Sequence, residues 1–125
     1  MKATPFLMFQ GDAKAALELW QSVVPDFTLL EMAEYAEGDM AGKVSSARIS
    51  IGGSQWMLND SPPVHNFSFT PSTSIFVECD DEEQLREMAD KLADSVMMPI
   101  DNYGFSQLFT WIADPFNVSW QLNLA

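Results

Sequence analysis

The sequence is poor in cysteine, histidine and basic residues. It has one Cys (Cys79), one His (His65), and six Lys and Arg against 18 Asp and Glu, which gives a net charge of −12. A lone cysteine forms no internal disulfide, which fits a reducing compartment. The negative field repels phosphate backbones and anionic lipid surfaces. We therefore expect no nucleic-acid partner and no membrane partner.

Long apolar runs are also missing. No stretch approaches the roughly 18 apolar residues of a membrane helix, and the first residues lack the apolar segment of a signal peptide. A cytoplasmic location is expected. What the chain does contain is a 47% apolar fraction with nine Phe and four Trp, within 125 residues. This is enough for one domain with a self-sufficient, aromatic-rich core.

Two segments have a helical pattern. The first helix is predicted near residues 13–24, because Asp12 is a good N-cap and Pro25 ends it. The second is predicted near 81–95, with Asp80 and Glu83 resembling a capping box and a buried stripe that runs on to Val96. Strands are predicted at residues 4–10, 27–35, 46–51, 55–59, 73–77, 108–113 and 118–124, and residues 97–102 as extended or loop.

The order strand-helix-strand-strand-strand therefore occurs twice. The segment Gln55–Asn59 (QWMLN) is matched by Ser119–Asn123 (SWQLN) 64 residues later. We predict an α+β fold of two βαβββ modules, about 1–62 and 66–125, in one domain, with mixed sheets curved around a cleft.

Alternation along the last strand of each module suggests which side chains line the cleft. Trp120 and Leu122 should face a helix, which leaves Gln121 and Asn123 on the opposite face. The first module has Met57 and Asn59 at the same places. These four residues are the candidate ligand-binding set. The alternative is that they bond only to each other or to water.

Two further side chains have reactive groups. His65 could act as a general base or contact a ligand, but it has no carboxylate at a fixed spacing, so a structural or surface histidine is the alternative. Cys79 lies between Glu78 and Asp80, whose charges raise a thiol pKa, so it is not expected to be a nucleophile. No catalytic residue is assigned.

Several segments resemble the PhnB-like branch of the vicinal oxygen chelate superfamily, which includes glyoxalase I, bleomycin-resistance proteins and extradiol dioxygenases. They are PFLMFQGD at 5–12, HNFSFTP at 65–71, MPID at 98–101 followed by Phe105-Ser106, and VSWQL at 118–122. The resemblance covers nearly the whole chain and implies a βαβββ repeat and a homodimer. Two positions depart from the family pattern: Leu19-Trp20 replaces Phe-Tyr, and Asn117 replaces Gly, although Asn tolerates the left-handed conformation.

The resemblance also implies where a metal would bind. Its ligands come from the first and last strands of each module, here Pro5, Met57, Thr73 and Gln121. None is a His, Cys, Asp or Glu, the donors that transition metals need. We expect no metal and no other cofactor, and neither metal-dependent glyoxalase nor dioxygenase activity. Sequences of this kind are often labelled 3-demethylubiquinone 3-methyltransferases, but no strand, glycine-rich loop and helix is present to hold a methyl-donor nucleotide.

Three functions follow from these observations. The first is binding of a small uncharged or aromatic metabolite or drug-like molecule in a metal-free cleft. The second is a metal-independent enzyme, which would show a titratable cleft group with a shifted pKa. The third is a structural homodimer without a ligand.

Overall fold

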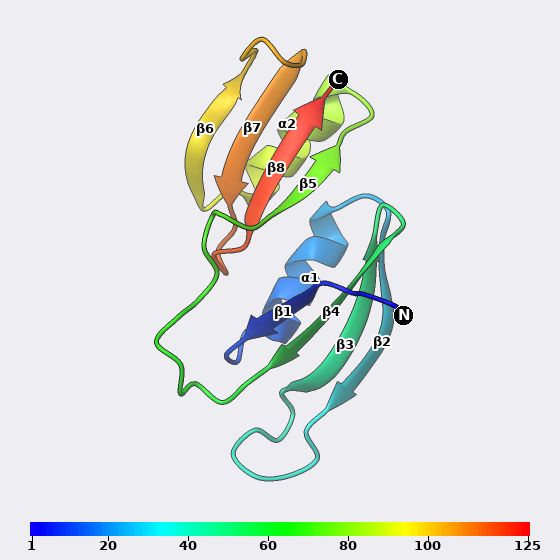
Figure 1. Cartoon of the computed structure of the whole chain (residues 1–125), viewed down its shortest axis with the longest axis vertical. Coiled ribbons are helices and arrows are strands. Elements are labelled where there is room, and N and C mark those ends of the chain that lie inside the picture. Colours follow the sequence, from blue (N-terminus) through cyan, green and yellow to red (C-terminus); the bar gives the residue numbers. More distant parts are fainter. The chain divides into compact units, whose positions relative to one another are not determined.

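The computed structural model describes residues 1–125. The chain forms two compact units, Met1–Phe67 and Ser68–Ala125. Each contains one helix and one four-stranded mixed sheet, in the order strand-helix-strand-strand-strand (Figure 1). The predicted α+β fold with two βαβββ modules is therefore confirmed. Neither helix has the length and apolar character needed to cross a bilayer.

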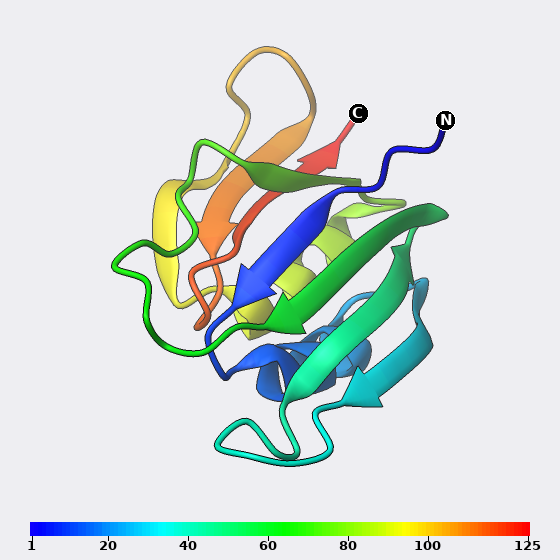
Figure 2. The same cartoon turned by 60° about the horizontal axis from the view of Figure 1, so that its bottom comes forward.

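The N-terminal unit is built around a sheet with strand order β1-β4-β3-β2. Its elements are β1 (Phe6–Phe9), α1 (Ala13–Val23), β2 (Phe27–Glu34), β3 (Val44–Ile51) and β4 (Ser54–Asp60). Strand β1 is parallel to β4, and the other pairs are antiparallel. The β3–β4 hairpin turns at Gly52 and Gly53, whose φ values of 55° and 85° suit glycine in a tight two-residue turn. Figure 2 shows α1 lying along one side of this sheet.

The C-terminal unit repeats this arrangement with strand order β5-β8-β7-β6. Its elements are β5 (Ser74–Glu78), α2 (Glu82–Leu92), β6 (Ser95–Asp101), β7 (Leu108–Ala113) and β8 (Ser119–Leu124). Asn117, in the β7–β8 turn, has a φ of 67°, the left-handed conformation expected from the sequence.

The second helix is shorter than predicted. It ends at Leu92, and the segment expected to be extended or loop is the edge strand β6. Val96 therefore leaves the predicted helical stripe and lies on β6 with 56% of its surface exposed. Pro99 is tolerated in β6 because the strand is at the sheet edge and its pairing with β7 is irregular.

Each helix covers one face of its own sheet. The buried face of α1 consists of Ala13, Ala16, Leu17 and Trp20, and that of α2 of Leu85, Met88, Ala89 and Leu92. In the C-terminal sheet, Trp120 pairs with Ile112 and Leu122 with Thr110, and all four are buried. The indole Nε1 of Trp120 donates to Asp114 Oδ2 at 3.0 Å. Trp120 thus packs in the core, as predicted.

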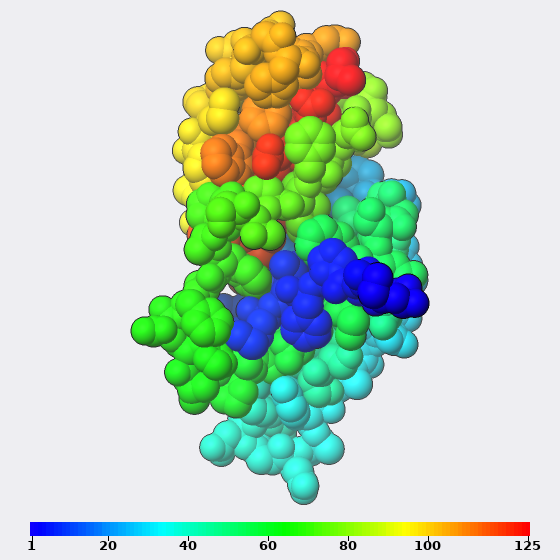
Figure 3. Space-filling view, viewed as in Figure 1, coloured from blue at the N-terminus to red at the C-terminus, as the bar shows by residue number.

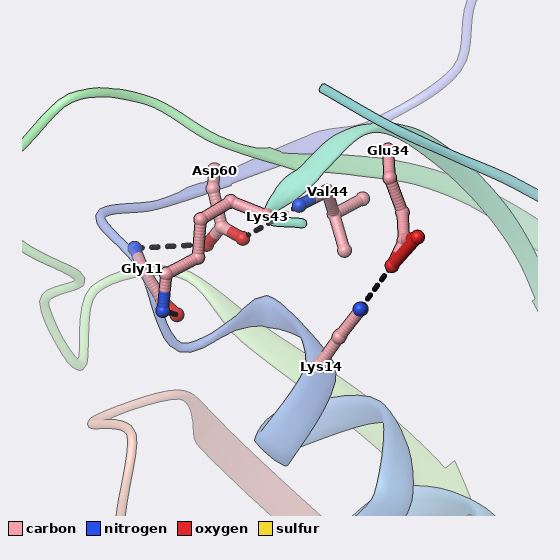
Figure 4. Close-up of polar contacts among 6 residues, drawn as sticks. All are labelled: Gly11, Lys14, Glu34, Lys43, Val44 and Asp60. Atoms are coloured by element: carbon pink, nitrogen blue, oxygen red, sulfur yellow. Dashed lines mark hydrogen bonds and ion pairs between the residues drawn. The ribbon is translucent and has the colours of Figure 1, made fainter. Parts of the chain in front are cut away.

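The start of α1 depends on a distant residue. Asp12 occupies the N-cap position, but its side chain makes no capping bond, contrary to the expectation from sequence. The buried Asp60, at the end of β4, caps the helix instead. Its Oδ1 accepts from the N–H groups of Gly11 (2.8 Å) and Ala13 (3.0 Å), and its Oδ2 accepts from Val44 N–H (3.0 Å), as Figure 4 shows in part.

The surface around this cap carries two cations. Lys43 Nζ donates to Gly11 O at 3.1 Å, and Lys14 forms an ion pair with Glu34 (Figure 4). Both lysines are bound to exposed groups, so neither compensates the buried Asp60 directly. The carboxylate is stabilised by the backbone N–H groups themselves.

The start of α2 is capped by residues that lie next to it in the sequence. Asp81, one residue after the predicted Asp80, is the N-cap, and its Oδ1 accepts from Gln84 N–H at 2.8 Å. The Gln84 side chain returns to accept from Asp80 N–H at 2.8 Å. The cap is therefore shifted by one position from the sequence assignment. It differs from a standard capping box because Gln84 bonds the N–H of Asp80, the residue before the N-cap, and not that of Asp81.

A matched pair of substitutions tests the role of Asp60. Asp60→Asn replaces one carboxylate oxygen by an NH2 group, which then faces a backbone N–H donor. The three backbone N–H groups that bond to Asp60 are left with a single acceptor oxygen. We expect a loss of about 3 kcal/mol in the free energy of unfolding, measured by urea denaturation. Asp12→Asn, with the same chemistry at the formal N-cap, should cost less than about 0.5 kcal/mol. Equal losses would contradict this assignment.

Candidate functional site

Each sheet has a second face, opposite its helix, and the four candidate ligand residues lie on these helix-free faces. Met57 and Asn59 flank the buried Leu58 on β4, and Gln121 and Asn123 flank the buried Leu122 on β8. Because side chains alternate along a strand, each pair points away from its helix. Met57 and Asn59 therefore share the helix-free face of the N-terminal sheet, and Gln121 and Asn123 share that of the C-terminal sheet.

The two asparagines share an unusual feature. The side-chain Oδ1 atoms of Asn59 and Asn123 are both buried and accept no hydrogen bond from the chain. An unpaired buried polar atom costs about 1–3 kcal/mol, and such groups are rare in folded proteins. Here one occurs at the same place in both modules, and Asn123 is only 8% exposed. Each oxygen is therefore an unused hydrogen-bond acceptor.

The surroundings of the two pairs differ. In the N-terminal sheet, Met57 lies beside Phe6 on β1 and Arg48 on β3. The Arg48 guanidinium lies 3.4 Å from Glu31 Oε1 and 3.4 Å from Gln55 Oε1. This face is therefore charged and crossed by an ion pair.

The C-terminal face is aromatic. Gln121 lies between Phe76 on β5 and Trp111 on β7. Trp111 Nε1 donates to Ser119 Oγ at 2.7 Å, and Ser119 Oγ is 2.7 Å from Ser74 Oγ. These bonds fix the indole ring against the sheet. Phe76 has no such restraint and is 52% exposed.

A loop extends this aromatic face. Phe109 on β7, the cross-strand partner of Asn123, contacts Phe105 at a centroid distance of 5.0 Å and Tyr103 at 6.1 Å. Phe105 is 64% exposed. Tyr103 is held by a bond from its hydroxyl to Pro99 O at 2.6 Å. Residues 102–107 gather at the end of the C-terminal unit, as the gold atoms of Figure 3 show. These rings were not predicted from the sequence, where the available signal was the two aromatic residues around Gly104.

His65 lies elsewhere, on the exposed segment that follows β4. Its imidazole stacks on Phe67 at 4.7 Å and makes no hydrogen bond or ion pair. The segment is attached to β1 by Gln10, whose side chain accepts from His65 N–H (3.1 Å) and donates to Phe67 O (2.9 Å). His65 is therefore held by its backbone, and its contact with a ligand remains a prediction.

The two grooves on the helix sides are separate from these faces. One, of about 500 Å³, lies between α2 and the strands β6 and β7, with mainly apolar walls. The other, of about 280 Å³, lies between α1 and β2. None of the candidate ligand residues lines either groove.

Comparison with known proteins now decides the family. Residues 1–123 match the family described as 3-demethylubiquinone-9 3-methyltransferase. The structure of the PhnB protein from Bacillus cereus, given the same description, is 37% identical over 100% of both chains, with a TM-score of 0.92. The chain belongs to the PhnB-like branch of the vicinal oxygen chelate superfamily.

More distant structures share the fold. A glyoxylase/bleomycin resistance protein/dioxygenase domain from Frankia is 15% identical, with a TM-score of 0.67 over 100% of this chain and 97% of that one. The fosfomycin resistance protein FosX from Listeria monocytogenes is 8% identical, with a TM-score of 0.62 over 100% and 93%. No curated protein sequence matches this PhnB-like chain.

The superfamily's metal position can be located by strand register. Met57 lies beside Phe6 and Gln121 beside Phe76, so the first-strand positions are Phe6 and Phe76. The residues proposed from sequence counting, Pro5 and Thr73, precede these strands. Counting back from the helix caps did not lead to Phe6 and Phe76, because the parallel register of the strands decides which residues pair. Two phenyl rings, a thioether and an amide do not fit a zinc, nickel, manganese or iron site.

Neither helix start resembles a phosphate-binding strand–helix turn, which offers free backbone N–H groups to an anion. In the β1–α1 turn the N–H groups of Gly11 and Ala13 already bond to the Asp60 carboxylate. The first turn of α2 is capped by Asp81 and carries Glu82 and Glu83, whose charges repel an anion.

Cys79 is a buried thiol that directly follows β5. Burial raises its pKa from 9.0 to about 11; a backbone hydrogen bond from Asn123 opposes this shift, and the charges of Asp80 and Asp81 add to it. The thiol therefore stays protonated at neutral pH, which removes the nucleophilic thiolate.

Proposed function

We propose that this PhnB-like protein binds a small uncharged or aromatic molecule, a metabolite or a drug-like compound, on the helix-free face of the C-terminal sheet. The observation that carries the proposal is Asn123, a buried amide with an unpartnered oxygen beside aromatic side chains. Ligand sites combine apolar walls with a few polar groups that set orientation. Gln121 and Asn123 would supply the polar groups, and Phe76 and Trp111 the walls.

The N-terminal pair has a secondary place in this proposal. Met57 and Asn59 occupy the equivalent positions, and Asn59 has the same unpartnered oxygen. The neighbouring Arg48–Glu31 pair makes that face polar and less suited to an aromatic ring. We propose that a ligand on this face would meet the amide of Asn59 and the thioether of Met57, and that the exposed ring of His65 offers a ligand contact of its own.

A binding role is favoured over a metal-independent enzyme by the titratable groups. A catalytic acid or base is expected to show a shifted pKa within the site. The pKa shift at Cys79 belongs to a buried thiol that lines none of the proposed site. Gln121, Asn123, Phe76 and Trp111 carry amides and aromatic rings, which do not act as general acids or bases at neutral pH.

The binding proposal is tested by Asn123→Leu together with a panel of small aromatic and polar compounds. Leucine has a similar volume and removes the unpartnered oxygen, so the free energy of unfolding should rise by about 1 kcal/mol. A compound at 100 times its Kd should stabilise the native protein by about 2.7 kcal/mol in thermal melts. Asn123→Leu should lose most of that ligand effect.

The exposed Asn66 provides the control, because Asn66→Leu makes the same chemical change away from the sheet. It should leave both the stability and the ligand response close to those of the unmodified chain. If no compound raises the melting temperature, or if both variants respond to it equally, the proposed site is wrong.

We also propose that binding needs neither a metal nor a methyl donor. Elemental analysis after dialysis should find far less than one transition metal per chain, and a chelator should leave the thermal melt unchanged, because the superfamily positions offer no imidazole, thiolate or carboxylate. The ligand response should appear without added S-adenosylmethionine. One tightly bound metal per chain, removed by a chelator with a loss of ligand response, would contradict this view.

The expected assembly is a homodimer. Strand β2 is an edge strand of eight residues, and its Leu30 and Met32 side chains are exposed. Unpaired edges with apolar side chains are usually covered by a partner. Light scattering at micromolar concentration should give about twice the 14.0 kDa chain mass, and Leu30→Glu should shift the protein towards the monomer. A monomeric native chain would exclude this assembly.

A further inference from the structure

One row of side chains crosses all four strands of the C-terminal sheet on its helix-free face. Strand register pairs Asp101 on β6 with Phe109 on β7, Phe109 with Asn123 on β8, and Asn123 with Glu78 on β5. Cross-strand partners lie on the same face. With strands about 4.8 Å apart, the two carboxylates stand at the ends of a row roughly 14 Å long. Between them lie a ring and an amide with an unpartnered oxygen.

Three aromatic rings cover one end of this row. Phe109 meets Tyr103 at an interplanar angle of 86° and Phe105 at 73°, while Tyr103 and Phe105 are nearly parallel at 14° with centroids 6.3 Å apart. The rings therefore present both faces and edges around Phe109. Tyr103 and Phe105 remain accessible, being 38% and 64% exposed. The face of an aromatic ring carries partial negative charge and attracts cations.

No basic side chain of the C-terminal unit lies on this surface. The C-terminal unit contains ten acidic residues but only two basic ones, Arg86 and Lys91. Both lie on α2, on the other side of the sheet, and both are paired, Arg86 with Glu82 at 2.9 Å and Lys91 with Glu87 at 2.6 Å. Glu78 forms no ion pair. The charges of this unit therefore make the potential on this face negative, which favours a positively charged ligand.

From this arrangement we propose that the ligand is an organic cation, an aromatic molecule bearing a protonated amine or a quaternary ammonium group. The cationic group lies against Phe105 and Tyr103, and the carboxylates of Glu78 and Asp101 supply the opposing charge. The Asn123 amide turns its oxygen to a donor on the ligand. The inference rests on the proposed binding function and narrows the ligand class of that site.

A metal cation fits this surface less well than an organic one. Calcium and magnesium need several oxygen ligands within about 2.6 Å of one point, whereas Glu78 and Asp101 lie at opposite ends of the row. The chain has no group of three or more His, Cys, Asp or Glu side chains arranged for a metal. The exposed rings add attraction only for a cation with an apolar surface.

Three probes of similar size and different charge distinguish the ligand classes: benzyltrimethylammonium, benzyl alcohol and benzoate. Binding to the full chain is measured by isothermal titration and by chemical-shift changes in NMR spectra. We expect the cation to bind at least about tenfold more tightly than the alcohol, with benzoate weakest. The affinity of the cation should fall several-fold between about 20 and 200 mM salt, because the surface charges are screened.

Variants locate the cation on this row. Phe105→Ala and Asp101→Asn should each weaken benzyltrimethylammonium binding by about three- to fivefold and leave benzyl alcohol less affected, since both residues lie at the end of the row that holds the rings. Glu83→Gln removes one charge on the exposed first turn of α2 and should leave binding within about twofold. Because Phe105, Asp101 and Glu83 are all exposed, the variants should fold normally.

The outcomes separate this inference from the function on which it rests. If the alcohol binds as tightly as the cation, with the loss at Asn123→Leu described above, the cation inference fails and the binding function stands. If neither the probes nor the compound panel binds, both fail. If Glu83→Gln weakens cation binding as much as Asp101→Asn, binding reflects only net charge and the site is not the one proposed.

Discussion

The N-terminal module depends on the buried carboxylate of Asp60. Its two oxygens bind the turn after β1, the first residue of α1 and the first residue of β3. Its carbonyl oxygen accepts from the Tyr35 hydroxyl at 2.8 Å, which holds the end of β2 as well. Removing this side chain would leave several buried donors without acceptors, and each loss is costly. Since Asp60 immediately follows Asn59, the same network fixes the end of the strand that carries Met57 and Asn59.

Much of the fold could be predicted because the relevant signals are local. Periodicity located both helices, Gly52-Gly53 located a hairpin, and the left-handed Asn117 followed from its place in a turn. The cap by Asp60 was missed because it joins residues more than 40 positions apart, and a plausible local cap, Asp12, was present. Phe76 was not recognised as the neighbour of Gln121 because strand register is a long-range property that helix caps do not determine.

The candidate site was predicted only in part. Alternation placed Gln121 and Asn123 on the helix-free face, since the side-chain period of a strand is fixed. It could not show that the Asn123 oxygen lacks a partner, because that depends on every neighbouring group. Nor could it place Tyr103 and Phe105 beside Phe109, because they belong to a loop whose path has no periodic signal. The aromatic character of the face therefore emerges only in three dimensions.

The different caps of the two helices have a consequence for how the chain folds. The cap of α2 closes within four residues, from Asp81 to Gln84, so this helix can nucleate before its sheet has formed. The cap of α1 cannot form until Asp60, at the end of β4, reaches the start of the helix. Closing the long loop between them has an entropy cost that must be met before the cap bonds form. On the ribosome α1 is made first, yet its N-terminus stays uncapped until β4 has been synthesised and docked. Folding of the N-terminal module is thus tied to completion of its sheet, whereas the C-terminal module can begin from its helix.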